Sequence, residues 1–96
     1  MPAYVLGHLK MKDPSWVEKY RATVPSIVAR HGGKYLVRGG KMEILEGSAP
    51  LPTSFVVLEF PSMEKARAFY NDPEYGPFIK LRQAGSDLEM VLVEGL

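Results

Sequence analysis

The order of strand-like and helix-like segments is the feature of this sequence that most restricts its fold. Strand signals cover residues 3–9, 34–46, 54–60 and 88–94, and helix signals lie between the first and second and between the third and fourth. This β-α-β-β-α-β order is the split pattern of an α+β domain. Right-handed crossovers place both helices on one face of a four-stranded antiparallel sheet, for which we expect the strand order 4-1-3-2.

The first helix carries clear start and stop signals. Asp13 is the expected N-cap and Pro14 the first helical residue. Its apolar face is expected to consist of Trp16, Tyr20, Val24 and Ile27. Pro25 interrupts this face and predicts a kink. The helix is expected to end at Gly32-Gly33, because glycine readily takes the left-handed cap conformation.

The second helical region divides into two helices. Ser62 is the expected N-cap of the first, whose inward residues are predicted to be Ala66, Phe69 and Tyr70. Asp72 and Pro73 repeat the cap-and-proline signal. They predict a short third helix whose apolar residues are Tyr75, Phe78, Ile79 and Leu81.

The segment HGGKYLVRGG, residues 31–40, places two glycine pairs around a short apolar strand. We expect the strand to continue to residue 46, with a bulge or sharp bend at Gly39-Gly40. The next segment, GSAPLPT, is predicted to be a surface loop. Two charged side chains lie between the glycine pairs, Lys34 at the start of the strand and Arg38 within it. An arginine inside an apolar strand needs an anionic partner or a route to water.

Alternation along the strands predicts an apolar sheet face that the helices do not cover. In the third strand Val56, Leu58 and Phe60 should face the helices. The opposite face is expected to carry Tyr4, Leu6, His8, Leu36, Arg38, Phe55, Val57, Glu59, Glu89, Val91 and Val93. Because so much contiguous apolar surface is unusual on a solvated sheet, we expect a homodimer in which two such faces pack together. A small-molecule site would then lie between the two sheets.

Composition excludes several classes of function. The net charge is +1 and basic residues form no run, which argues against a nucleic-acid partner. With no cysteine and two histidines, we expect no metal site, and we expect no cofactor. No apolar stretch approaches the roughly 20 residues of a membrane span, and no signal peptide is recognisable. The expectation is a single cytoplasmic domain over residues 1–96.

Arg38 and Glu59 are the first candidates for a functional site. Both are expected at one end of the open face, where a salt bridge between them is the default interpretation. Arg38 has donors to spare and is able to bind an anionic ligand as well, whereas Glu59 is a candidate base. His8 is a candidate proton shuttle, expected at the opposite end of the sheet near Asp87 and Glu89.

Tyr75 and Arg82 lie on the predicted short helix. They either form the mouth of a pocket or belong to the exposed surface. His31 is expected to cap the first helix, whose C-terminus favours a cation. HGGKYLVRGG is not a phosphate loop, because its glycines flank a strand and do not lead into a helix. No Ser-His-Asp arrangement is recognisable.

The chain resembles a bacterial family, domain of unknown function 1330, over essentially its whole length. The matching segments are Tyr20 and Pro25, HGGKYLVRGG, VVLEFPSMEKA, FYNDPEY, Leu81-Arg82 and LVEG. The resemblance implies a ferredoxin-like sheet that pairs into a dimeric α/β barrel, as in cofactor-less monooxygenases and muconolactone isomerase-like proteins. It also implies that Arg38, Glu59, Tyr75 and Arg82 are the polar site positions. Ser54 departs from the family, whose members often have arginine there.

Three hypotheses about function follow. The first is a homodimer that binds a small anionic and partly apolar molecule, with Arg38 as its anchor. The second is a cofactor-independent isomerase or monooxygenase, which rests on fold analogy and needs His8 or Glu59 as proton acceptor. The third is a structural or interaction domain without a ligand.

Overall fold

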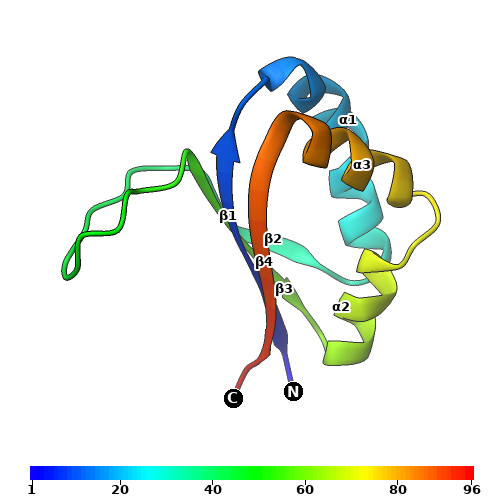
Figure 1. Cartoon of the computed structure of the whole chain (residues 1–96). Helices are drawn as coiled ribbons and strands as arrows, with labels where there is room; N and C mark the ends of the chain where they lie inside the picture. Colours follow the sequence, from blue (N-terminus) through cyan, green and yellow to red (C-terminus); the bar gives the residue numbers. More distant parts are fainter.

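The computed structural model describes residues 1–96 and confirms the predicted order of elements and strands. The elements are β1 (Ala3–Met11), a 3-10 helix η1 (Pro14–Trp16), α1 (Val17–Arg30), β2 (Lys34–Arg38), β3 (Ser54–Phe60), α2 (Met63–Tyr70), α3 (Gly76–Gly85) and β4 (Ser86–Glu94). The antiparallel sheet has the order β2-β3-β1-β4. All three α-helices cover the same face of it (Figure 1). No helix is long and apolar enough to cross a membrane.

The predicted caps form at both helical regions. The Asp13 side chain accepts a hydrogen bond from the Ser15 N–H at 2.9 Å, and Ser62 accepts one from the Lys65 N–H at 3.2 Å. Asp72 accepts one from the Glu74 N–H at 2.9 Å, but it caps a turn, and α3 begins only at Gly76. Pro77 has no N–H to donate to the Pro73 carbonyl, so a helix that begins at Pro73 cannot continue through residue 77, and α3 instead begins with Pro77 in its first turn.

The core lies between the helices and the covered face of the sheet. Its largest buried side chains include a row of stacked aromatic rings from β3, α2 and the α2–α3 turn. Phe60 and Phe69 have ring centroids 5.3 Å apart, and Phe69 and Tyr75 are 4.5 Å apart. The predicted inward position of Tyr70 is wrong, because this side chain is 43% exposed at the end of α2.

The second strand is much shorter than predicted. β2 ends at Arg38, and Gly39 and Gly40 have φ angles of +77° and +96°, which glycine tolerates better than other residues. The bend at Gly39-Gly40 is confirmed, but residues 41–46 form no strand. Residues 39–53, here called the arm, leave the sheet and project away from the helices (Figure 1). The side chain of Leu45 in the arm is 91% exposed.

A β-bulge in β2 moves Arg38 to the face opposite the predicted one. Tyr35 pairs with Leu58, but Val37 pairs with Val57, so Leu36 is the additional residue. Because alternation restarts after the bulge, Arg38 pairs with Val56 and shares the helix-covered side of the sheet. The prediction that Arg38 lies on the open face is therefore wrong.

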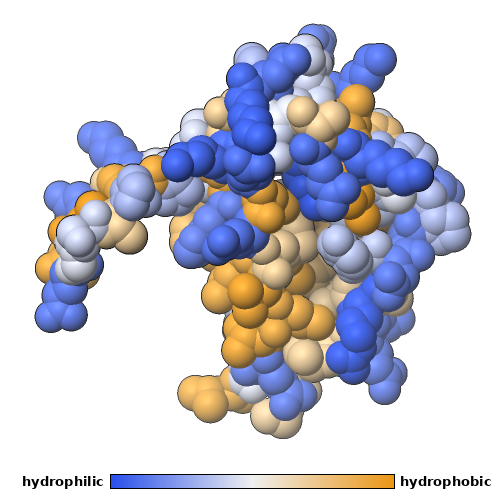
Figure 2. Space-filling model, viewed as in Figure 1, coloured by the Kyte–Doolittle hydropathy of each residue, from blue (hydrophilic) through white to orange (hydrophobic).

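The open face is otherwise as predicted. Leu58 and Phe60 are buried under the helices, while Val91 and Val93 on β4 are 58% and 45% exposed. Tyr4, Leu6 and Phe55 are half-buried and His8 is exposed. Hydrophobic residues gather along the sheet beside β4 (Figure 2). No element of this chain covers that face.

Candidate functional site

A cavity of about 120 Å³ lies between the sheet and the helices. It crosses all four strands, since Tyr35 and Arg38 of β2 line it together with Met90 of β4. Its walls are mostly apolar, and its polar lining residues are Tyr20, Arg21, Tyr35, Arg38, Ser54, Tyr75 and Arg82. This cavity is inside one chain, on the side of the sheet opposite the predicted site between two sheets.

A cluster of one arginine and two tyrosines forms the buried end of the cavity. Nη1 of Arg82 on α3 donates hydrogen bonds to the Tyr75 hydroxyl at 2.6 Å and to the Tyr20 hydroxyl at 3.1 Å. The two hydroxyl oxygens are 2.5 Å apart. Arg82 is 4% exposed and Tyr75 is 1% exposed, so the interpretation of these residues as exposed surface is wrong.

The buried charge of Arg82 has no counter-charge within the chain. A guanidinium stays protonated in proteins, and no Asp or Glu side chain lines the cavity. The Nε–H of Arg82 has no acceptor in the chain either. Burial raises the pKa of the Tyr75 hydroxyl, which therefore remains neutral and supplies no negative charge. Burying a cation without an anionic partner costs free energy, so this end of the cavity favours an anionic ligand.

The other polar end of the cavity lies beside β2. Arg38 is exposed, and its guanidinium carbon is 5.1 Å from the centre of the Tyr35 ring. Arg21 on α1 lines the same cavity, and neither Arg21 nor Arg38 forms a salt bridge. Burial raises the pKa of Tyr35 to about 12, so it is a neutral hydrogen-bonding group at neutral pH. Ser54 of β3 lines the cavity too.

Glu59 does not pair with Arg38. It forms a salt bridge with Lys34 at 3.2 Å and pairs with it across the strands, at the opposite end of β2 from Arg38. Hydrogen bonds from Lys34 and Tyr4 hold the pKa of Glu59 below its usual value. The predicted Arg38–Glu59 salt bridge is wrong because β2 ends at Arg38, which makes this residue the last of its strand.

His8 also lies away from the cavity. Its ring packs against Phe55 with centroids 4.6 Å apart, on the open face, and it pairs across the strands with Glu89 as predicted. The structure thus brings Tyr75, Arg82 and Arg38 to one cavity and leaves His8 and Glu59 outside it. It gathers no group of three His, Cys, Asp or Glu side chains in a metal-binding arrangement.

Sequence reasoning did not find Tyr20, Arg21 or Tyr35 as site residues. Tyr20 follows Trp16 at helical spacing and therefore looks like a core residue. The available signal was its hydroxyl, because a buried tyrosine usually needs a hydrogen-bond partner. Nothing in the sequence shows that this partner comes from residue 82.

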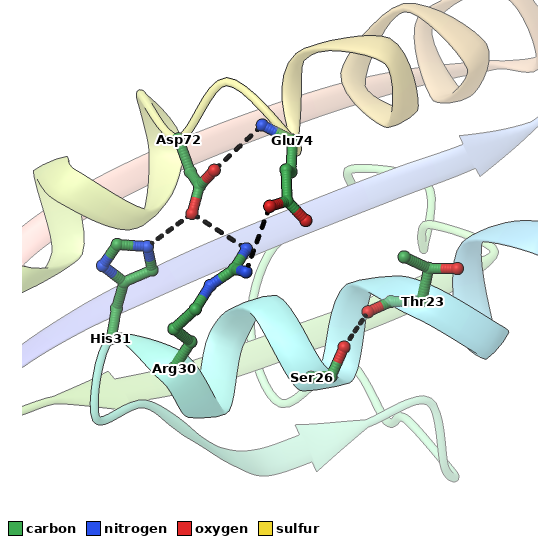
Figure 3. Close-up of polar contacts among 6 residues, drawn as sticks. All are labelled: Thr23, Ser26, Arg30, His31, Asp72 and Glu74. Carbon is green, nitrogen blue, oxygen red and sulfur yellow. Dashed lines mark hydrogen bonds and ion pairs between the residues drawn. The ribbon is translucent and has the colours of Figure 1, made fainter.

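A polar cluster fixes the turn that carries Tyr75. His31 Nε2 lies 2.8 Å from Asp72 Oδ2, and Arg30 Nη2 lies 3.1 Å from the same oxygen (Figure 3). Glu74 pairs with Arg30 Nη1 at 3.3 Å. His31 is the C-cap residue of α1, as predicted, and its side chain also forms a hydrogen bond with Asp72. Asp72, three residues before Tyr75, ties the turn to α1.

Replacing Asp72 by asparagine is expected to lower the melting temperature at pH 7. The hydrogen bond from His31 comes first among the causes that hold the pKa of Asp72 below its usual value. A carboxyl group with a lowered pKa stabilises the fold above its unfolded-state pKa of about 4, and this contribution disappears as the pH falls through the folded-state value. Melting curves of wild type and variant should therefore converge in acid. A difference that stays constant down to pH 2 would contradict this assignment.

The family model described as "Domain of unknown function (DUF1330)" matches residues 2–96. No curated protein sequence matches the chain significantly. Among solved structures, a protein of unknown function from Rhodopseudomonas palustris superposes with a TM-score of 0.82 at 20% identity, covering 99% of this chain and 82% of that one. The cofactor-independent oxygenase SnoaB from Streptomyces nogalater gives 0.66 at 16% identity, covering 99% and 93%.

A third structure has the same architecture. A putative antibiotic biosynthesis monooxygenase from Nitrosomonas europaea superposes with a TM-score of 0.61 at 19% identity, covering 100% of this chain and 99% of that one. At these identities the likeness shows a shared ferredoxin-like fold.

Proposed function

The chain belongs to the family described as Domain of unknown function (DUF1330), and on that premise we propose that it is a homodimer that binds a small, planar anion in its interior cavity. The observation that carries this proposal is Arg82, a buried cation at the cavity whose only side-chain hydrogen-bond partners are two tyrosine hydroxyls. Binding of an anion would supply the charge that the chain does not. Arg82 therefore replaces Arg38 as the primary anchor.

The size and walls of the cavity restrict the ligand. An engineered apolar cavity of about 150 Å³ takes up benzene, so about 120 Å³ suits a single ring with its acidic group at the Arg82 end. Val5, Val24, Val56 and Leu58 provide apolar walls for the ring. A monocyclic aromatic carboxylate or phenolate combines this shape with the required charge.

An enzymatic function is the second candidate, favoured by the fold shared with a cofactor-independent oxygenase and by the donors of the Arg82 cluster. Hydrogen-bond donors fixed in a water-poor site stabilise an enolate or phenolate as it forms. No histidine or carboxylate lines the cavity, so His8 and Glu59 are not supported as proton acceptors there. The Arg82 cluster would stabilise an oxyanion in this second function.

Thermal denaturation with benzoate and its neutral analogue benzamide tests the ligand proposal. Benzoate is expected to raise the melting temperature of wild type, with about 2.7 kcal/mol of stabilisation at one hundred times its Kd, and benzamide is not. Arg82→Gln should abolish the benzoate effect. Arg67→Gln, an exposed arginine on α2 outside the cavity, is the charge-matched control and should retain it. Equal shifts with benzoate and benzamide would refute the requirement for an anion.

The dimer proposal rests on the exposed apolar face. Val91 and Val93 lie on this face with Leu6, Phe55 and Val57, a set that a second copy of the chain would cover. Light scattering at micromolar concentration is expected to give the dimer mass for wild type and the monomer mass for Val91→Lys. Gln83→Lys on the exposed side of α3 should remain dimeric. A monomeric wild type would contradict the proposal.

A further inference from the structure

We propose that the ligand carries two acidic groups at opposite ends of its ring, and that Arg38 and Arg21 bind the group that lies farther from Arg82. The substrate class is therefore a para-substituted aromatic dianion, such as a benzene-1,4-dicarboxylate. This inference rests on the proposed function, because it assumes that the first acidic group occupies the Arg82 end.

The topology separates the two ends of the cavity. Arg38 is on β2 at one edge of the sheet, whereas α3, which carries Arg82, packs against η1, α1 and β4 at the other side. Three strand spacings of about 4.8 Å place β2 and β4, whose side chains both line the cavity, about 14 Å apart at backbone level. A ligand that contacts both Arg82 and Arg38 therefore has to reach from α3 to β2, which favours acidic groups at opposite ends of its ring.

The distribution of charge also indicates two anionic groups. The chain has 11 acidic residues and none of them lines the cavity, while three arginines do. Arg21 and Arg38 form no salt bridge with another part of the chain, so their donors remain available. A guanidinium binds a carboxylate through two parallel hydrogen bonds, which makes each arginine able to hold one end of the ligand.

Arg38 is also held in position before a ligand binds. The adjacent Gly39 N–H donates to the Phe55 carbonyl at 2.9 Å, which fixes the end of β2 on β3. The Tyr35 ring lies 5.1 Å from the guanidinium carbon and offers a cation–π contact. A side chain that is oriented in advance loses less entropy on binding and therefore discriminates better between ligands.

Calorimetric titration with terephthalate and benzoate tests the inference. Wild type is expected to bind terephthalate at least about tenfold more tightly than benzoate, as two charge-assisted hydrogen bonds would give. The double variant R21Q/R38Q should lose this preference while its affinity for benzoate changes by less than about threefold. The arginine control R67Q should retain the preference. Isophthalate, whose second carboxylate points elsewhere, should bind wild type no more tightly than benzoate.

The outcomes separate the two proposals. If benzoate binds in an Arg82-dependent manner and terephthalate binds no more tightly, the second acidic group is refuted and the proposed function stands. If R21Q/R38Q keeps the preference for terephthalate, Arg21 and Arg38 are not the residues that recognise it. If neither acid binds wild type, the proposed function and this inference both fail. Circular dichroism of each variant excludes loss of the fold as the cause.

Discussion

Replacing Arg82 by methionine is expected to raise the melting temperature of the free protein by roughly 4–8 °C and to abolish its stabilisation by benzoate. Methionine is apolar and flexible enough to occupy the same space, and it removes a buried charge that lacks a counter-charge. Tyr20 and Tyr75 keep their mutual hydrogen bond, so each hydroxyl retains a partner. A gain of about 1 kcal/mol corresponds to this shift for a domain of this size. Scanning calorimetry with and without benzoate measures both effects.

A fall in the melting temperature, in place of a rise, would assign a different role to Arg82. If Arg82→Met lowered the melting temperature by a similar amount, the arginine would be a structural element that holds α3 against α1. Arg82→Lys separates charge from geometry, since lysine keeps the charge without the planar group that reaches both hydroxyls. We expect Arg82→Lys to bind benzoate weakly and to gain no stability. Loss of binding together with gain of stability is the pattern of a residue kept for function.

Replacing Gly85 by alanine is expected to destabilise the fold by about 3 kcal/mol, the upper part of the range for overpacked cores. A Cβ atom there would lie 2.2 Å from Trp16 Cδ1 and 2.7 Å from the carbonyl oxygen of Asp13. The Gly85 carbonyl also accepts hydrogen bonds from the Lys12 and Asp13 N–H groups at 3.0 and 2.9 Å, which hold η1 at the end of α3. The chain has one tryptophan, so urea denaturation followed by fluorescence reports directly on Trp16.

Gly76→Ala provides the matched control. Gly76 is the first residue of the same helix, and apart from its chain neighbours and the backbone of its own helix no atom lies within 4 Å of the position its Cβ would take. Alanine restricts the unfolded chain more than glycine does, but its Cβ would precede the Pro77 ring, so the two effects oppose each other and the free energy of unfolding should change by no more than about 1 kcal/mol. Equal stability changes at both positions would show that helix propensity, and not contact with Trp16, determines the result.

The fold could be predicted from this sequence because its signals are local. Alternation in SFVVLEF sets both the bounds of β3 and the buried side of Leu58 and Phe60. Asp13 and Ser62 mark helix starts through hydrogen bonds that span only two or three residues. The strand order then follows from the handedness of crossover connections.

The candidate site could be predicted only in part. The sequence offers Arg38, Tyr75 and Arg82 as candidates, and all three line the cavity, but their surroundings depend on long-range contacts and on one irregularity. The hydrogen bond between Arg82 and Tyr20 joins residues 62 positions apart, and no local pattern reports it. The bulge at Leu36 leaves the composition of β2 unremarkable, yet it invalidates the alternation rule from Val37 onward.

The bulge at Leu36 decides which side of the sheet carries the charge of Arg38. With a regular β2, Arg38 would point toward the second protomer of the proposed dimer and bring a charge into an apolar contact. The single additional residue instead places Arg38 on the cavity side of the sheet and leaves the open face uncharged at that position. In evolutionary terms, the gain or loss of one codon in β2 would exchange a feature of ligand recognition for an obstacle to assembly.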